Sequence, residues 1–133
     1  MSEKNLRLEV VTPEKKVLSE DIQSLIVPAT EGYLGVLYNH APLIAGLQIG
    51  IIKYKKNDEE KTMSISGGFL EVSNNKATII AKTAEFPEEI DVERAKRAME
   101  RAEKRLKSRD KNIDVLRAEL ALRRAQTRLS LKS

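Results

Sequence analysis

The pattern of apolar and polar residues changes once along the chain. From residue 5 to residue 82, apolar residues alternate with polar ones or form short runs that end at turn residues, which is typical of β-strands. From Ile90 onward they recur at steps of three and four residues, which predicts amphipathic helices. The sequence therefore predicts an α+β protein, with an N-terminal all-β sandwich at residues 1–86 and a C-terminal antiparallel two-helix hairpin at residues 87–133.

Turn residues divide the first part into several short strands. Pro28 and the Asn-Asn pair at 74–75 mark strand ends, and the Gly-Gly pair at 67–68 marks a bulge or a tight bend between two strands. The segment 31–42, with two glycines and a proline, is expected to be an exposed loop, and so is the charged segment 55–61. The expected strands are 6–10, a short segment at 17–18, about 22–27, 43–54, 63–66, 69–72 and 77–81.

The helical part contains an internal repeat. Residues 90–106 read IDVERAKRAMERAEKRL and residues 113–129 read IDVLRAELALRRAQTRL, and 10 of the 17 aligned residues are identical at an offset of 23. Only six polar residues, 107–112, separate the two copies, so the second helix is expected to run antiparallel to the first. Each copy has one narrow apolar stripe: Val92, Ala95, Met99, Ala102 and Leu106 in the first, and Val115, Ala118, Leu122, Ala125 and Leu129 in the second.

Alanine fills the middle of this predicted seam between the helices. Burying a methyl group contributes about 0.8 kcal/mol, against about 1.5–3 kcal/mol for a large aliphatic side chain. The two helices can therefore approach closely, but only modest free energy holds them together. Two interpretations are open: a static hairpin that stabilises the domain, and a hairpin that opens and closes.

Charged residues are distributed unevenly between the two parts. The 133 residues carry a net charge of +4, but residues 1–89 hold 10 Lys and Arg against 13 Asp and Glu, whereas residues 90–133 hold 14 against 7. A basic hairpin of this kind suits nucleic acid, a membrane surface, an acidic protein or a bound anion. Aromatic residues that would stack on single-stranded nucleic acid are missing after Phe86, so we expect no nucleic-acid partner.

Composition also bounds the chemistry and the location. The chain has no cysteine and a single histidine, His40, which excludes disulfides, thiolate metal sites and histidine-rich metal clusters. His40 has no Ser, Cys or paired acid near it in sequence, and the spacing of Gly32 and Gly35 fits neither phosphate-binding glycine motif. No apolar run approaches the roughly 20 residues of a membrane span, and the N-terminus lacks the apolar core of a signal peptide. We therefore expect a cytoplasmic protein.

An arginine cluster on the hairpin is the strongest candidate for a binding site. Folding the hairpin near its midpoint places Asp91 near Arg128. The same folding places Arg94 near Arg124, beside the start of the first helix, where unpaired N–H groups favour an anion. Arg101 shares a helix face with Arg94, so four guanidinium groups can converge on one polyphosphate.

Two carboxylates extend this cluster toward a nucleotide pocket. Glu85 and Asp91 cannot bind phosphate, but they can accept hydrogen bonds from the amino group of a base. The alternative is that the arginines are solvated or pair with carboxylates along the helix faces, namely Glu88, Glu93, Glu100 and Glu119. No nucleophile, acid–base pair or set of metal ligands accompanies the cluster, so we expect binding without turnover and no enzyme.

Motifs spread over the whole chain resemble the epsilon subunit of bacterial F-type ATP synthases. They are GYLGVL at 32–37 with His40-Ala41-Pro42, SGGFLEV at 66–72, IDVERA at 90–95 and RAELAL at 117–122. One departure lies at Tyr38-Asn39, where members of this family often carry Pro-Gly before the histidine.

The resemblance implies a set of partners and a regulatory role without catalysis. The sandwich would lie at the foot of the rotor against the gamma subunit and the c-ring, with Tyr33 and His40 in the contacting loop. The hairpin would lie on the sandwich in a closed state. In an extended state its basic helices would enter the catalytic head of alpha and beta subunits, meet acidic segments of beta and block ATP hydrolysis. The implied location is the cytoplasmic face of the bacterial cell membrane, as a peripheral protein.

The resemblance also implies a regulatory ligand. In several Bacillus-like members ATP binds the closed hairpin through a motif of the form Ile/Leu-Asp-x-x-Arg-Ala. The residues that the resemblance assigns to ATP here are Glu85, Ile90, Asp91, Arg94, Ala95, Arg101, Arg124 and Arg128. A magnesium requirement stays open, and the alternative function is a purely structural coupling subunit whose static hairpin binds no nucleotide.

Overall fold

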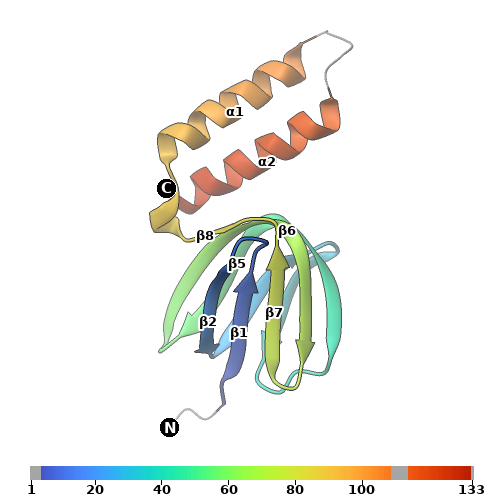
Figure 1. The fold of residues 1–133 in the computed structure, drawn as a ribbon, viewed down its shortest axis with the longest axis vertical. Coiled ribbons are helices and arrows are strands. Elements are labelled where there is room, and N and C mark those ends of the chain that lie inside the picture. The colour runs from blue at the N-terminus through green and yellow to red at the C-terminus, as the bar shows by residue number, and fades with distance from the viewer. Residues whose placement is uncertain (1–3, 109–113, 133) are drawn as a thin grey trace. The chain divides into compact units, whose positions relative to one another are not determined.

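The chain divides into two structural units, Met1–Phe86 and Pro87–Ser133. A computed structural model describes residues 4–108 and 114–132 (Figure 1). The strands are β1 (Leu6–Val11), β2 (Lys16–Ile22), β3 (Ser24–Ala29), β4 (Gly32–Leu37), β5 (Leu43–Lys56), β6 (Glu59–Ser73), β7 (Lys76–Ala81) and β8 (Ala84–Glu85). The helical elements are the 3₁₀ turn η1 (Pro87–Glu89), α1 (Val92–Lys107) and α2 (Val115–Lys132). The expected α+β class, a β-sandwich followed by two helices, is confirmed.

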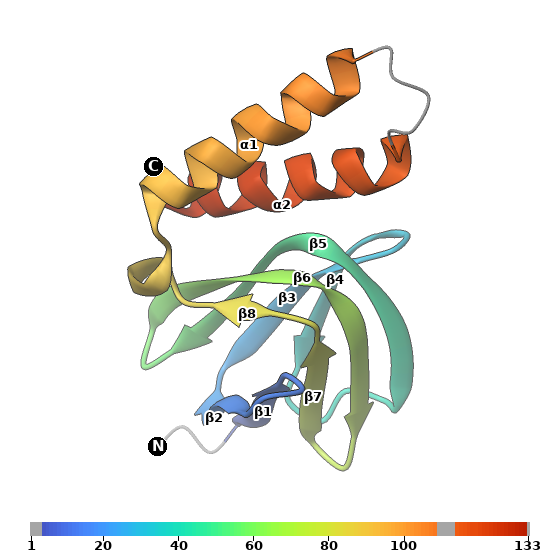
Figure 2. The same ribbon diagram turned by 45° about the horizontal axis from the view of Figure 1, so that its top comes forward.

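The strands of the first unit form one hydrogen-bonded sheet that closes around a core. Their order is β2-β1-β7-β6-β5-β3-β4, and β8 pairs with β6. The two longest strands, β5 and β6, run side by side and curve strongly (Figure 2). β1 and β7 pair in parallel, with Arg7 opposite Lys76, whereas the other strand pairs in the described residues are antiparallel.

The sandwich core follows from alternation along the strands. On β1, Leu6, Leu8 and Val10 are fully buried while Arg7 is exposed, which confirms the period-two pattern. The other large side chains that are fully buried are Ile22, Leu25, Val27, Val36, Ile52, Met63, Leu70, Val72 and Ile79. Burial of each large aliphatic side chain contributes about 1.5–3 kcal/mol, so the sandwich has a core of its own.

The strands near Pro28 differ from the prediction. The expected segments 17–18 and 22–27 are instead two longer strands, β2 and β3, and Pro28 lies inside β3 rather than after it. The ladder between β3 and β5 shifts register between Ile26 and Ala29. Proline has no N–H to donate, and this interruption of the ladder allows it within a strand.

Two expected loops are largely strands. Within 31–42, residues Gly32–Leu37 form the edge strand β4, with Val36 buried against the core. Within 55–61 only Asn57 and Asp58 form the turn, because Lys55 and Lys56 lie opposite Glu60 and Glu59 in the β5–β6 ladder. Opposite charges on facing strands make these polar ends compatible with a sheet.

Positive φ angles identify the tight turns and one irregular strand position. Asn74 and Asn75 have φ of 50° and 59°, which confirms the expected Asn-Asn hairpin turn between β6 and β7. The Gly-Gly pair at 67–68 lies inside the continuous strand β6 and not between two strands. Gly67 and Gly68 have φ of 92° and 149°, which side chains rarely adopt, so glycine is needed there.

A charged network covers the outer face of β1, β2 and β7. Glu9 accepts a hydrogen bond from Ser19, and its two carboxylate oxygens lie 3.2 Å from Nζ of Lys76 and 3.6 Å from Nζ of Lys16. The hydrogen bond from Lys76 and the charges of both lysines lower the pKa of Glu9 below its ordinary value. The folded chain therefore favours the ionised carboxylate.

This network predicts how acid affects the sandwich. Because the pKa of Glu9 is lower in the folded chain, its contribution to stability is complete above the pKa of the unfolded chain and is lost as the pH falls through the folded value. We expect Glu9→Gln to have a lower urea midpoint than the parent at pH 7 and a smaller further loss on acidification to pH 3. Glu14→Gln, at an exposed turn, is the control and should follow the parent at both values. Equal losses in the parent and Glu9→Gln would contradict the assignment.

Candidate functional site

The second unit is an antiparallel helical hairpin in which both helices begin in the same way (Figures 1 and 2). Asp91 caps α1, since its Oδ1 accepts a hydrogen bond of 3.1 Å from the backbone N–H of Arg94. Asp114 holds the equivalent position before α2, where its Oδ1 accepts a hydrogen bond of 3.0 Å from the N–H of Arg117. The internal repeat therefore has a structural counterpart in two matching helix starts.

The predicted alanine seam is buried. Ala95, Ala102, Ala118 and Ala125 are at most 4% exposed, whereas the larger residues of the stripe are half-buried or exposed. The prediction is wrong for Val115, which is 54% exposed. It is the first residue of α2, at the end of the stripe. The expected connection 107–112 falls for residues 109–112 outside the described part of the chain.

The first turn of α1 brings together the four residues of the Ile-Asp-x-x-Arg-Ala motif. Ile90 is 5% exposed and its N–H donates to the carbonyl oxygen of Pro87 over 3.2 Å. The N–H of Ala95 donates to the carbonyl oxygen of Asp91 over 3.0 Å. Arg94 is exposed, between the capping Asp91 and the buried Ala95. The motif therefore combines a helix N-terminus, an exposed guanidinium group and a small residue, Ala95, that leaves room for a ligand or a neighbouring helix to come close to the backbone.

The arginines of α2 lie at the same end of the hairpin as this motif. Arg124 and Arg128 are four residues apart, hence on one face of α2, and both are half-buried. Because the helices run antiparallel, the last turns of α2 lie beside the first turn of α1 (Figure 1). Arg101 is exposed and lies seven residues after Arg94, about 10 Å further along α1 by the helical rise. Three of the four arginines are thus gathered at one end, and Arg101 approaches them from the middle of α1.

The alternative role for these arginines, as partners of helix carboxylates, is not observed for three of them. Within residues 4–108 and 114–132, Arg94, Arg101 and Arg124 form no side-chain hydrogen bond or ion pair. Their positive charges are therefore available to an anion. Glu85 belongs to the first unit, at the end of β8, where it lies opposite Ser64 of β6.

The two residues expected to contact a partner lie on β4 and in the turn that follows it. Tyr33 is 77% exposed on the edge strand β4. His40 is half-buried, and its Nδ1 lies 2.7 Å from the carbonyl oxygen of Ala41. A carbonyl oxygen only accepts, so Nδ1 carries the proton and donates, which fixes the ring as part of the turn. Tyr33 offers an aromatic surface, and His40 a positioned ring without catalytic neighbours.

An exposed apolar row on the sandwich was not predicted from the sequence. Phe69 of β6 lies opposite Ile80 of β7 and Gly46 of β5, and Ile44 lies two residues from Gly46 on the same side of β5. Ile44 is 76% exposed, Phe69 61% and Ile80 54%. The sequence did contain a signal for this row, because each of the three residues is adjacent in sequence to a buried or half-buried apolar residue. Apolar residues therefore occur at both phases of these strands, and those on the outer face form an exposed apolar row.

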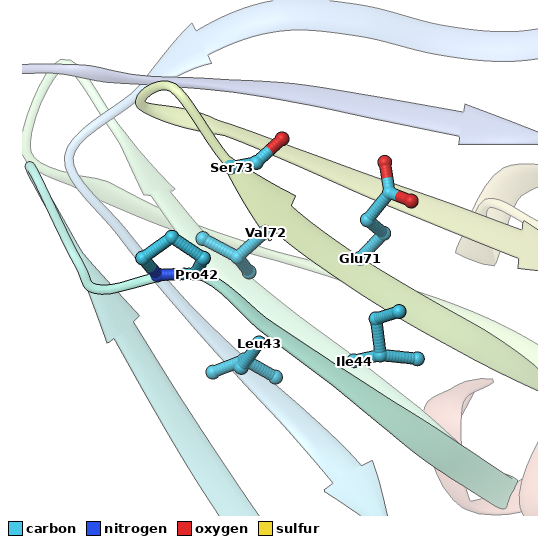
Figure 3. Close-up of a pocket in the computed structure, with 6 residues that line it drawn as sticks. All are labelled: Pro42, Leu43, Ile44, Glu71, Val72 and Ser73. Atoms are coloured by element: carbon cyan, nitrogen blue, oxygen red, sulfur yellow. The ribbon is translucent and has the colours of Figure 1, made fainter.

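An open hollow of about 470 Å³ adjoins this row at one end of β5 and β6 (Figure 3). It is lined by Pro42, Leu43, Ile44, Glu71, Val72 and Ser73. Figure 3 shows the apolar side chains of Leu43 and Ile44 on one strand and Glu71 and Ser73 on its neighbour. The hollow therefore extends the apolar row toward the segment that contains His40.

Residues 4–108 and 114–132 contain neither a cluster of metal ligands nor a helix suited to span a membrane. No group of three or more His, Asp or Glu side chains in this part of the chain is arranged to hold a metal ion. None of the helices described there has the length and apolar character required to cross a bilayer.

Comparison with known proteins accounts for both units. The family described as "ATP synthase, Delta/Epsilon chain, beta-sandwich domain" matches residues 5–87, and "ATP synthase, Delta/Epsilon chain, long alpha-helix domain" matches residues 88–132. The chain belongs to the delta/epsilon family of ATP synthase subunits. The resemblance to epsilon subunits of bacterial F-type ATP synthases is therefore confirmed, as is the expectation of a non-catalytic subunit.

Named relatives agree with this family assignment. The ATP synthase epsilon chain of Pelotomaculum thermopropionicum is 56% identical over 106 residues, covering 80% of this chain and 79% of the relative. The epsilon chain of Syntrophomonas wolfei is 51% identical over 110 residues, covering 82% and 80%. Among solved structures, a chain of the Euglena gracilis mitochondrial ATP synthase, OSCP/F1/c-ring, has a TM-score of 0.82 and 26% identity, covering 93% of this epsilon-family chain and 79% of the other.

Proposed function

We propose that this chain is a rotor subunit of the ATP synthase central stalk whose hairpin binds ATP and thereby regulates ATP hydrolysis. The observation that carries the proposal is the gathering of Asp91, Arg94, Arg124 and Arg128 at one end of the hairpin, where the N-terminus of α1 also lies. A helix N-terminus and several arginines in one place are the usual means by which proteins hold a polyphosphate.

Each residue of this cluster has a distinct task toward ATP. Arg94, Arg124 and Arg128 would bind the phosphates through forked N–H donors, with Arg101 reaching from the middle of α1. One oxygen of Asp91 caps the helix, and the carboxylate keeps a second oxygen that can accept a hydrogen bond from the adenine amino group. Ile90 and Ala95 support the helix start. Glu85 belongs to the other unit, and its role toward the amino group stays a prediction from the resemblance.

Regulation follows from the weak seam between the helices. Alanine contacts hold α1 and α2 together with little free energy, so the closed hairpin is sensitive to any ligand that contacts both helices. Moving an equilibrium from 1:99 to 99:1 needs about 5.5 kcal/mol of differential binding, which several charged hydrogen bonds supply. ATP would stabilise the closed hairpin, and scarce ATP would release basic helices that enter the alpha/beta head and inhibit hydrolysis.

The proposal is tested by ATP binding to the purified chain and to an arginine variant. We expect Arg124→Ala to weaken ATP binding by about 10- to 100-fold in isothermal titration calorimetry, because a hydrogen bond to a charged group contributes about 1.5–3 kcal/mol. Arg97→Ala is the matched control, since Arg97 is exposed on the side of α1 opposite the seam and should leave the affinity unchanged. Equal affinity of Arg124→Ala and the parent would refute the pocket.

The sandwich would supply the attachment to the rotor. The exposed row of Ile44, Phe69 and Ile80 has the apolar character of a permanent protein interface, and Tyr33 and His40 extend it toward the loop after β4. We propose the gamma subunit and the c-ring as the partners, which would keep the chain at the cytoplasmic face of the membrane as a peripheral protein. The competing function is a static coupling subunit that binds no nucleotide.

A further inference from the structure

We infer that the hairpin carries a second phosphate-binding cluster, formed by Arg101, Arg105 and Arg117, at the end opposite the proposed ATP site. The inference extends to the whole hairpin the chemistry proposed for one end, so its ligand class rests on the proposed function. The internal repeat, the matching helix starts and the distribution of charge on one face of the hairpin support it.

The repeat relates the arginines of the two ends one by one. At the offset of 23 residues, Arg94 corresponds to Arg117, Arg101 to Arg124 and Arg105 to Arg128. Asp91 corresponds to Asp114, and the two aspartates make the same capping hydrogen bond. The cluster of Arg94, Arg124 and Arg128 therefore has a complete copy in Arg117, Arg101 and Arg105.

The antiparallel arrangement decides where this copy lies. Two identical antiparallel helices are exchanged by a twofold axis perpendicular to the plane that contains them. Such an axis exchanges the two ends of the hairpin but keeps each side chain on the same face. The second cluster therefore lies on the same face as the first, at the end formed by the last turns of α1 and the first turn of α2 (Figures 1 and 2). Arg94 and Arg105 are 11 residues apart, about 16 Å along α1, so the two clusters lie at different ends of the hairpin. Arg101 lies between these two residues and is the one arginine assigned to both clusters.

This face of the hairpin is rich in arginine and poor in carboxylates. At about 100° per residue, Arg94, Arg101 and Arg105 lie within about 40° of one another around α1, and half-buried Ala98 separates them from the seam. The carboxylates of the helix bodies lie about 100° or more from the centre of the arginine row on their own helix: Glu93, Glu100 and Glu103 on α1 and Glu119 on α2. Among the described residues of the two helices and their caps, Asp91 and Asp114 are the carboxylates nearest to the row.

The arginines of the second cluster are free to bind. Arg101, Arg105 and Arg117 are all exposed, and within the described residues their guanidinium groups form no hydrogen bond or ion pair. Three unneutralised guanidinium groups in one place repel one another, and an anion with several phosphate groups relieves that repulsion. The cluster is thus equipped for an oligophosphate.

The repeat also indicates what the second cluster does not recognise. It duplicates the arginines and the helix cap, but it does not include Glu85, one of the two acids proposed to bind the adenine amino group. The second cluster should therefore bind the phosphates of a ligand without selecting a base. Inorganic tripolyphosphate is a suitable probe, because it has the charge of the ATP phosphates and no nucleoside.

The test is calorimetric titration of the purified full chain with tripolyphosphate and, separately, with ATP. We expect two equivalents of tripolyphosphate and one tightly bound equivalent of ATP, because the second cluster makes no contact with the base and should bind the ATP phosphates more weakly. The variant R105A/R117A should lose one equivalent of tripolyphosphate and keep its ATP affinity within about threefold. The variant R94A/R128A should lose the other equivalent and the tight ATP site. R97A/R123A removes the same charge from positions about 60° and about 120° around the helices from the two arginine rows, and it should retain both equivalents.

The outcomes separate this inference from the proposed function. A single equivalent of tripolyphosphate in the parent would overturn the second cluster while leaving the ATP site intact. So would a loss in R97A/R123A equal to that in R105A/R117A, because net charge alone would then account for binding. Two equivalents of tripolyphosphate without a tight ATP site would support the second cluster and refute the proposed nucleotide sensor.

Discussion

Replacing Gly68 with alanine is expected to unfold the sandwich. Gly68 has φ of 149°, and a Cβ added there would overlap the carbonyl oxygen of Ile80 and lie 2.9 Å from Cα of Ala81. Both are backbone atoms of β7, so they cannot move aside without breaking the β6–β7 ladder. Overpacking and backbone strain each cost about 1–3 kcal/mol, which together approach the total stability of about 5–15 kcal/mol of a small domain.

This expectation is measured by urea unfolding and near-ultraviolet circular dichroism of Gly68→Ala beside a matched variant. Gly35→Ala is that control, because a Cβ at Gly35 meets no atom within 4 Å on the exposed side of β4. Its midpoint should lie close to that of the parent. A native spectrum and an unchanged midpoint for Gly68→Ala would contradict the close approach of β6 to β7.

Placing a charge in the alanine seam is expected to open the hairpin and abolish ATP binding while leaving the sandwich folded. Ala118 is 2% exposed, and it is none of the residues proposed to contact ATP. A buried carboxylate without a partner costs several kcal/mol, more than the alanine contacts contribute. In Ala118→Asp we therefore expect rapid amide exchange in α1 and α2, unchanged exchange in the core strands, and ATP affinity reduced by at least about 100-fold.

Leu116→Asp provides the control for this variant, since Leu116 is 65% exposed on the same helix. It adds the same charge without burying it and should bind ATP like the parent. The pair also separates the two functions considered for the hairpin. A static coupling subunit predicts that opening the seam leaves hydrolysis by the assembled ATP synthase unchanged, whereas a mobile inhibitor predicts that Ala118→Asp lowers it at high ATP.

The hairpin could be predicted from the sequence because the residues that determine it lie close together along the chain. The repeat, the short connection and the aspartates before each helix are contiguous signals, and the buried alanines followed directly from their spacing. The arginine cluster followed from the same geometry, since antiparallel helices of known length bring fixed positions to one end. Glu85 differs, because it belongs to the other unit. The spacing of residues within the helices gives no information about where a residue outside them lies.

The sheet was harder to predict because its pairings are distant in sequence. Glycines at 32 and 35 indicated a loop, yet the segment becomes β4 because β3 offers it a partner and Val36 a buried position. Phe69 and Ile80 were read only as strand residues. Their exposure depends on which face of the sheet packs against the core, and that choice is made by the whole sandwich. Local patterns thus located the strands approximately but not their edges or outer faces.

The parallel pairing of β1 with β7 has a consequence for how the chain is made. During synthesis β1 can pair at once with β2, but its other edge stays open until residues 76–81 have left the ribosome. Contacts between such distant residues form slowly, whereas an antiparallel pair of helices assembles within microseconds to milliseconds. The nascent chain therefore completes its first domain only after most of that domain has been translated. The first strand to be synthesised is thus among the last to gain both of its neighbours in the sheet.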